Sequence, residues 1–161
     1  MRAPQRLDRT LHCYRIGDPD GAYPIVDATG SRLYPGRWNT PDSPVIYASE
    51  SYGTAMLEKL VHGAGRLPPN QHYVRIALPR AASYEIVTAD RVPEWASEEP
   101  FASREYGARW VREGRSLALL VPSYVARVER NVLINPGHAE FPTIETSLAE
   151  PVWWDARLFD R

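Results

Sequence analysis

The sequence predicts a single α+β domain, and three observations support this prediction. The chain has 161 residues, which is the usual size of one domain. Hydrophobic residues make up 43% and charged residues 24%, a composition that builds a buried core rather than a disordered chain. Apolar periodicity indicates several short strands and two helices. They do not alternate strictly, as they would in a doubly wound parallel sheet.

The first half of the chain gives strand, loop, strand and helix. Residues 11–16 alternate and predict a strand that ends at a Gly-Asp-Pro-Asp-Gly turn. Residues 22–44 show no period and predict a long loop, a feature that is usually functional or disordered. This loop carries Tyr34, Arg37 and Trp38, so we favour a functional loop. Residues 45–49 then predict a short apolar strand.

A helix follows over residues 52–62, with Ser49 or Ser51 as its N-cap and Gly63 at its end. On this helix Glu58 falls outside the apolar arc and in line with His62. The second half of the chain predicts further strands and one more helix. The strands are residues 73–78, 84–87, 117–121, 132–134 and 151–159, and the helix is residues 100–114. The run 117–121 is continuously apolar, which is typical of a buried strand.

Charge and cysteine content exclude several classes of protein. The chain has nineteen Lys and Arg and twenty Asp and Glu. This balance of charge argues against a surface that binds nucleic acid directly. Lys59 is the one lysine among these cations. The single cysteine, Cys13, cannot form an internal disulfide, so we expect a reducing, cytoplasmic setting. The sequence has no apolar signal segment and no apolar run of the roughly 18 residues that span a membrane.

Common catalytic motifs are absent from the sequence. It contains no glycine-rich nucleotide fingerprint and no Gly-x-Ser-x-Gly elbow. The four histidines lack metal-ligand spacing, so we expect no metal. What remains is a loop–strand–helix unit that carries Arg37, Tyr47 and Glu58. Each alone is ordinarily a surface or core residue, but on three consecutive elements they can converge on one cleft. Such a trio suits an anionic sugar nucleotide.

Polar residues near the ends of two later strands extend this set. Ser123 follows the buried strand 117–121, and Asn135 lies in the stretch from Asn131 to His138. Residues at strand ends are well placed to face a ligand. The alternative is that Asn135-Pro136 only forms a turn.

Together these pieces resemble the RES domain, which is named for its arginine, glutamate and serine. The pieces are Tyr14-Arg15-Ile16, Gly36-Arg37-Trp38-Asn39, Pro44-Val-Ile-Tyr47, Ser49-Glu-Ser51, Ala55-Met-Leu-Glu58, Val121-Pro-Ser123 and Asn131 through His138. They occur in the family's order, and the resemblance covers about residues 11–159 of a single domain, 1–161. The departures are Pro35, where many members have glycine, and Gly137.

The resemblance implies a fold, a function and a partner. RES proteins are toxins of type II toxin–antitoxin systems, and their partner is usually an antitoxin with an Xre-like helix-turn-helix. Their fold is similar to that of ADP-ribosyltransferases, in which small β-sheets flank an NAD⁺ cleft. Family members consume NAD⁺, by hydrolysis or phosphorolysis or by transfer of ADP-ribose to a protein. The matching active-site residues are Arg37, Tyr47, Glu58 and Ser123, with Arg15 and Asn135 as further candidates.

Elementary chemistry agrees with these roles. Rupture of the nicotinamide–ribose bond builds positive charge on the ribose, which a carboxylate such as Glu58 stabilises. Arg37 would neutralise diphosphate oxygens or fix the nicotinamide-side ribose. Tyr47 would stack on or orient the nicotinamide. Ser123 would hydrogen-bond the carboxamide or a ribose hydroxyl.

Several alternatives stay open at the level of sequence. The acceptor of ADP-ribose is water, phosphate or a protein side chain, and Arg32 is either an anion ligand or a surface charge. A ribonuclease toxin would use His12 or His138 as acid–base groups, and a non-enzymatic domain would only bind a nucleotide or a partner. Trp153-Trp154 is expected to pack in the core, with a docking surface as the alternative. If an antitoxin exists, we expect it to cover the cleft and to carry any DNA contact.

Overall fold

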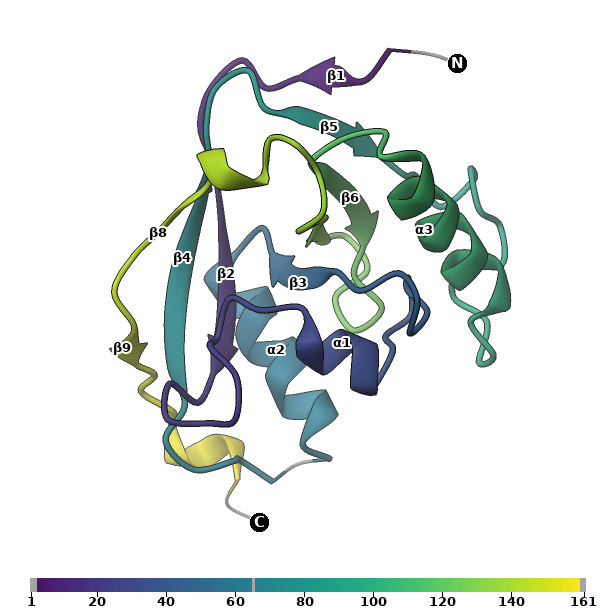
Figure 1. The fold of residues 1–161 in the computed structure, drawn as a ribbon. Coiled ribbons are helices and arrows are strands. Elements are labelled where there is room, and N and C mark those ends of the chain that lie inside the picture. Colours follow the sequence, from purple (N-terminus) through teal and green to yellow (C-terminus); the bar gives the residue numbers. More distant parts are fainter. Residues whose placement is uncertain (1–2, 65, 160–161) are drawn as a thin grey trace.

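A computed structural model describes residues 3–64 and 66–159. Within these residues it contains one curled mixed sheet, three α-helices and two 3₁₀ turns (Figure 1). The elements are β1 (Gln5–Arg6), β2 (Leu11–Gly17), α1 (Thr29–Leu33), β3 (Ile46–Ser49), α2 (Tyr52–His62), β4 (His72–Leu78), β5 (Ser83–Ile86), α3 (Phe101–Glu113), β6 (Ala118–Pro122), β7 (Arg130–Ile134), β8 (Glu145–Thr146) and β9 (Glu150–Pro151), with the 3₁₀ turns at Phe141–Thr143 and Ala156–Leu158. The single α+β domain is therefore confirmed.

The sheet is almost divided between β2 and β3. Its strand order is β1-β5-β6-β7-β3-β2-β4-β8, with β9 also paired to β4. Strand β2 pairs with β4 from Leu11 to Gly17, yet it meets β3 only at Tyr14 opposite Ser49. The separate small sheets that the resemblance implies are thus joined into one sheet by a single residue pair. Helix α2 packs against both β2 and β3 and so bridges this division.

The core lies on both faces of the central strands. Leu120 of β6 and Val132 of β7 belong to one buried cluster, which also contains Cys13 of β2. The neighbouring residues Leu119 and Leu133 point to the other face and pack with Trp110 of α3. This arrangement confirms the buried strand predicted from the continuous apolar run. Each such side chain contributes about 1.5–3 kcal/mol by leaving water.

The two long helices begin and end close to where the sequence predicts. Ser51 caps α2 by accepting a hydrogen bond from the Thr54 N–H at 3.2 Å. Helix α3 ends at Gly114, whose φ of +57° is the left-handed conformation that favours glycine. None of the helices in the described part of the chain is long and apolar enough to cross a membrane.

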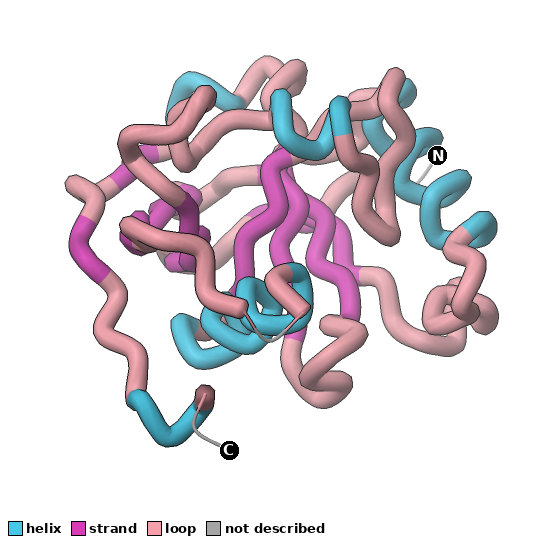
Figure 2. Tube along the Cα trace, turned by 90° about the horizontal axis from the view of Figure 1, so that it is seen from below, coloured by secondary structure: helices cyan, strands magenta, loops and turns pink. Residues whose placement is uncertain are grey.

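Two segments differ from the prediction. Helix α1 lies inside the predicted loop 22–44. The sequence pattern does not indicate this helix, because it is five residues long and its N-cap, Ala28, has no side chain that can cap it. The strand predicted at 151–159 is wrong: only Pro151 pairs, at the edge of β4, and Asp155 then caps a 3₁₀ turn. Figure 2 shows this segment running down one side, apart from the central strands. Trp153 is 78% exposed, so core packing is also wrong for it.

Candidate functional site

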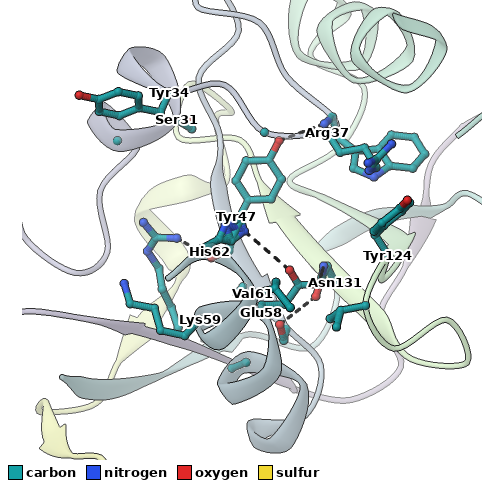
Figure 3. A pocket seen from close by; sticks show the side chains of 18 of the residues that line it. Ser31, Tyr34, Arg37, Tyr47, Glu58, Lys59, Val61, His62, Tyr124 and Asn131 are labelled. Carbon is teal, nitrogen blue, oxygen red and sulfur yellow. Dashed lines mark hydrogen bonds and ion pairs between the residues drawn. The ribbon is translucent and has the colours of Figure 1, made fainter. Parts of the chain in front are cut away.

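A cavity of about 740 Å³ opens where β2 and β3 separate. Strand β2 contributes Tyr14 and Arg15, and β3 contributes Tyr47. Helix α2 and the loop before β3 form further walls, and the segment after β6 contributes Tyr124 (Figure 3). We call this space the reaction cavity. Of the sequence candidates, it brings together Arg15, Arg37, Tyr47 and Glu58.

Glu58 is held in the wall of the reaction cavity by two hydrogen bonds to the same oxygen. Its Oε1 accepts from the Ser123 hydroxyl at 2.8 Å and from the Asn131 side-chain amide at 2.9 Å. Asn131 is itself oriented because its Oδ1 accepts from the Ser49 hydroxyl at 2.8 Å. The Glu58 side chain is 23% exposed, and His62 Nε2 lies 3.9 Å from Oε2. Oε2 is therefore the oxygen left for a ligand.

Ser123 and Asn135 do not line the reaction cavity. Ser123 is fully buried; its hydroxyl donates to Glu58 and accepts from the Ala126 N–H. It therefore supports the carboxylate in this structure and does not reach toward a ligand. Asn135 is buried in a turn, where its Oδ1 accepts from the Gly137 N–H at 2.9 Å. His12 and His138 are also outside the cavity wall.

Arg37 is fixed by backbone carbonyls and by an aromatic ring. Its Nη1 donates to the Trp95 carbonyl at 3.1 Å and to the Ser97 carbonyl at 2.6 Å. The guanidinium carbon lies 4.0 Å from the centre of the Tyr124 ring, a cation–π contact. Burial lowers the pKa of Arg37 from its ordinary value, but an arginine at this position stays charged at neutral pH.

Tyr47 holds the loop that carries Arg37. Its hydroxyl donates to Asn39 Oδ1 at 2.7 Å and accepts from the Trp38 N–H at 3.1 Å. A Cβ at Gly36 would lie 2.6 Å from this hydroxyl, so the close approach of loop and ring requires glycine. Burial raises the pKa of Tyr47. The hydroxyl is thus neutral and already bonded, and the ring is the part that lines the cavity.

Helix α3 clamps the same loop from the other side, which sequence reasoning missed. Arg104 donates to the Gly36 and Pro35 carbonyls at 2.8 and 3.1 Å. Ser103 donates to the Arg37 carbonyl at 2.6 Å. A Cβ at Gly107 would lie 1.7 Å from the Trp38 carbonyl oxygen. These positions share one side of a helix, and a glycine in mid-helix was the available signal.

The reaction cavity is positively charged although the chain is not. Four cations line it, Arg15, Arg37, Lys59 and Arg104, against the two carboxylates Glu58 and Glu98. The whole chain has a formal net charge of −1. This concentration of cations suits an anionic ligand. The part of the chain that the structure describes holds no group of three His, Cys, Asp or Glu placed to bind a metal ion.

Sequence comparison assigns the chain to a family. The RES domain family matches residues 12–155, so the chain belongs to the RES domain family. A "Prs ADP-ribosylating toxin" of Sphingobium sp. (strain YBL2) is 33% identical over 92% of this chain and 97% of its own length. A "Toxin Res" of Pseudomonas putida is 34% identical over 86% of this chain and 95% of its own.

A solved structure has the same fold. The Mycobacterium tuberculosis MbcT–MbcA toxin–antitoxin complex includes a chain that matches with a TM-score of 0.69 and 15% identity. The match covers 91% of this chain and 86% of that one.

Proposed function

We propose that this chain is the toxin of a toxin–antitoxin pair and that it breaks the nicotinamide–ribose bond of NAD⁺, transferring ADP-ribose to an acceptor. Membership of the RES family and the name of the Sphingobium relative support this proposal. The observation that carries it is Glu58, a carboxylate with one oxygen fixed by two donors in the wall of a cationic cavity.

Glu58 would act on the ribose next to nicotinamide. As the neutral nicotinamide leaves, positive charge develops on the ribose carbon. Oε2 of Glu58 stabilises this charge or accepts a hydrogen bond from a ribose hydroxyl. The bonds from Ser123 and Asn131 fix the carboxylate before substrate arrives. Such preorganisation lowers the barrier because no side chain has to reorient during the reaction.

Arg37 and Tyr47 would bind the rest of that half of the substrate. Arg37 offers a charged guanidinium whose position is set by two carbonyls and the Tyr124 ring. Tyr47 offers the face or edge of its ring, since its hydroxyl is engaged. We propose the ring as the contact for nicotinamide and Arg37 as the contact for anionic or ribose oxygens.

A protein side chain is the acceptor that the cavity mouth favours. Tyr34 and Val61 line the cavity and are 83% and 53% exposed, so the rim is apolar and open. A docked protein would cover such a rim. The name of the Sphingobium relative points the same way. Water and phosphate remain the competing acceptors in the test below.

The partner that we propose is an antitoxin that covers the cavity mouth and blocks Arg37 and Glu58. The structural neighbour is part of a toxin–antitoxin complex, which supports a partner of this kind. We propose an antitoxin of the Xre-like helix-turn-helix type, which would supply the DNA contact.

The test follows the adenine label of NAD⁺ incubated with the pure protein, with and without phosphate and with cell lysate. Label on one discrete protein band is the expected result. Label in free ADP-ribose would make the protein a hydrolase, and label in a phosphorylated ADP-ribose would make it a phosphorylase. No turnover by folded protein under any condition would contradict the proposal and favour a ribonuclease or a binding module.

A further inference from the structure

A second, smaller cavity adjoins the reaction cavity. It measures about 210 Å³ and lies against the loop that follows β2. Four residues line both cavities: Arg15, Ile16, Gly30 and Lys59. The two spaces therefore meet along a boundary that carries two cations. The proposed function leaves Lys59 without a role.

We propose that the second cavity binds the adenosine half of NAD⁺ and that Lys59 and Arg15 bind the diphosphate at the boundary between the two cavities. This inference rests on the proposed function, because it extends the substrate from Glu58 across that boundary.

The charges at the boundary favour a phosphate ligand. Arg15 is fixed by bonds from Nε to the Ile25 carbonyl and from Nη1 to the Tyr47 carbonyl. Neither Arg15 nor Lys59 has a carboxylate within 4.0 Å among residues 3–64 and 66–159. Burial, and then the charge of Arg15, lowers the pKa of Lys59, and the charge of Asp18 opposes this fall only in part. Burial likewise lowers the pKa of Arg15 against the opposing charge of Asp27. Two neighbouring cations whose nearest carboxylates lie beyond ion-pair distance are stabilised by an anion that lies between them.

The second cavity offers groups that suit a nucleoside. Asp18 and Asp27 bring carboxylates to its wall, and a carboxylate is the usual acceptor for ribose hydroxyls in dinucleotide sites. Hydrogen bonds from Thr29 hold the pKa of Asp27 below its ordinary value, so this carboxylate is ionised. Tyr23 and Ile25 supply an aromatic and an aliphatic surface for the adenine ring.

Helix α2 divides the substrate between the two spaces. Glu58 and Lys59 are consecutive, so their side chains leave the helix about 100° apart. Figure 3 shows Glu58 directed toward Asn131 and Lys59 directed away from it. Glu58 lines only the reaction cavity, whereas Lys59 lines both. In NAD⁺ the nicotinamide ribose is joined directly to the diphosphate. Glu58 and the neighbouring Lys59 are placed in the same order, with Glu58 at the ribose and Lys59 at the diphosphate.

The first test blocks the boundary with a side chain. Gly30 lines both cavities, and a Cβ there would meet nothing within 4 Å, so Gly30→Phe is expected to fold. The control is Gly53→Phe, a helical glycine with the same open space that lines neither cavity. Calorimetry would compare ADP-ribose with nicotinamide, which has no phosphate and would occupy only the reaction cavity. We expect Gly30→Phe to weaken ADP-ribose binding at least about tenfold and nicotinamide binding less than twofold.

The second test removes the boundary charge. Lys59→Gln is expected to weaken ADP-ribose binding about 10- to 100-fold, the range for one charged hydrogen bond to phosphate. The control is Arg112→Gln, which removes an exposed cation of α3 that lines neither cavity. Thermal unfolding of each variant would establish that it folds.

Three results would overturn the inference: wild-type protein that does not bind ADP-ribose, Lys59→Gln with wild-type affinity, or Gly30→Phe that weakens both probes equally. Failure of the proposed function would look different. It would leave NAD⁺ unconsumed by the wild-type protein, whereas the binding assays need no turnover.

Discussion

Glu58, Arg37 and Tyr47 line one cavity, as the spacing of the loop–strand–helix unit predicts, but their hydrogen bonds could not be predicted from sequence. The Tyr47 hydroxyl bonds to the loop, and the Ser123 hydroxyl bonds to Glu58. Which group forms a hydrogen bond with a given hydroxyl depends on how segments that are distant in the sequence pack together. For the same reason Asn131, 73 residues from Glu58, is recognisable in the sequence as part of a family motif but not as a partner of Glu58.

Asn131 is a positioning residue for Glu58, and its removal tests this role. Asn131→Leu keeps the side-chain size but deletes the donor to Oε1. We expect kcat for NAD⁺ to fall about 10- to 100-fold because the carboxylate loses its fixed orientation, while KM changes less than threefold. Steady-state kinetics would measure both constants.

Ser49→Ala is the graded control for that variant. It leaves the Asn131 amide in place but removes the hydroxyl that orients it, so its effect on kcat should be smaller and in the same direction. Wild-type kcat in Asn131→Leu, or a loss confined to KM, would show that Asn131 does not position the carboxylate.

The long periodic elements could be predicted from sequence, and the short or edge elements could not. Strand β4 and helices α2 and α3 follow from their own apolar patterns and caps. Helix α1 has too few residues for a period. The wrong strand at 151–159 arose because its apolar residues face solvent in part, as the exposed Trp153 illustrates.

Helix α3 holds the loop that carries Arg37, and a substitution of its mid-helix glycine tests this role. Gly107→Ala would place a Cβ against the Trp38 carbonyl, so we expect a loss of at least about 1–3 kcal/mol in the free energy of unfolding. The matched control is Gly53→Ala, which meets no atom within 4 Å and should be neutral or up to about 1 kcal/mol stabilising. Urea denaturation compares them, and equal effects of the two substitutions would contradict the clamp.

In the molecule as a whole, the reaction cavity lies where β2 and β3 separate. This division depends on which strands pair across the chain, with β3 beside β7 and β2 beside β4, and local patterns do not specify such pairing. The overall charge of the chain likewise does not indicate that the cavity is cationic. A formal net charge of −1 conceals a cavity lined by four cations and two carboxylates, because charges from distant segments meet only in the fold.

The stability of the whole domain should fall in alkali because of its one thiol. Burial, and then the charge of Glu50, raises the pKa of Cys13 from 9.0 to about 12. Between these values the unfolded chain has lost the proton and the folded chain keeps it, so stability falls as pH rises. Burial also raises the pKa of Tyr47, which adds to the fall above the ordinary tyrosine pKa of about 10.

Cys13→Ala isolates the contribution of the thiol. The variant should be less stable than wild type at pH 7, and the difference should shrink by about 1 kcal/mol between pH 9 and pH 10. Urea denaturation across this range measures the two curves. Parallel curves would mean that the thiol titrates alike in both states.

The most direct test of the account is NAD⁺ turnover by Glu58→Gln, which keeps the shape of the side chain and removes its charge. We predict a fall in kcat of about 10²–10³ or more and loss of growth arrest in cells, with an unchanged unfolding temperature and retained ADP-ribose binding. A folded Glu58→Gln protein that consumed NAD⁺ at the wild-type rate, or still arrested growth, would contradict the role given to this carboxylate.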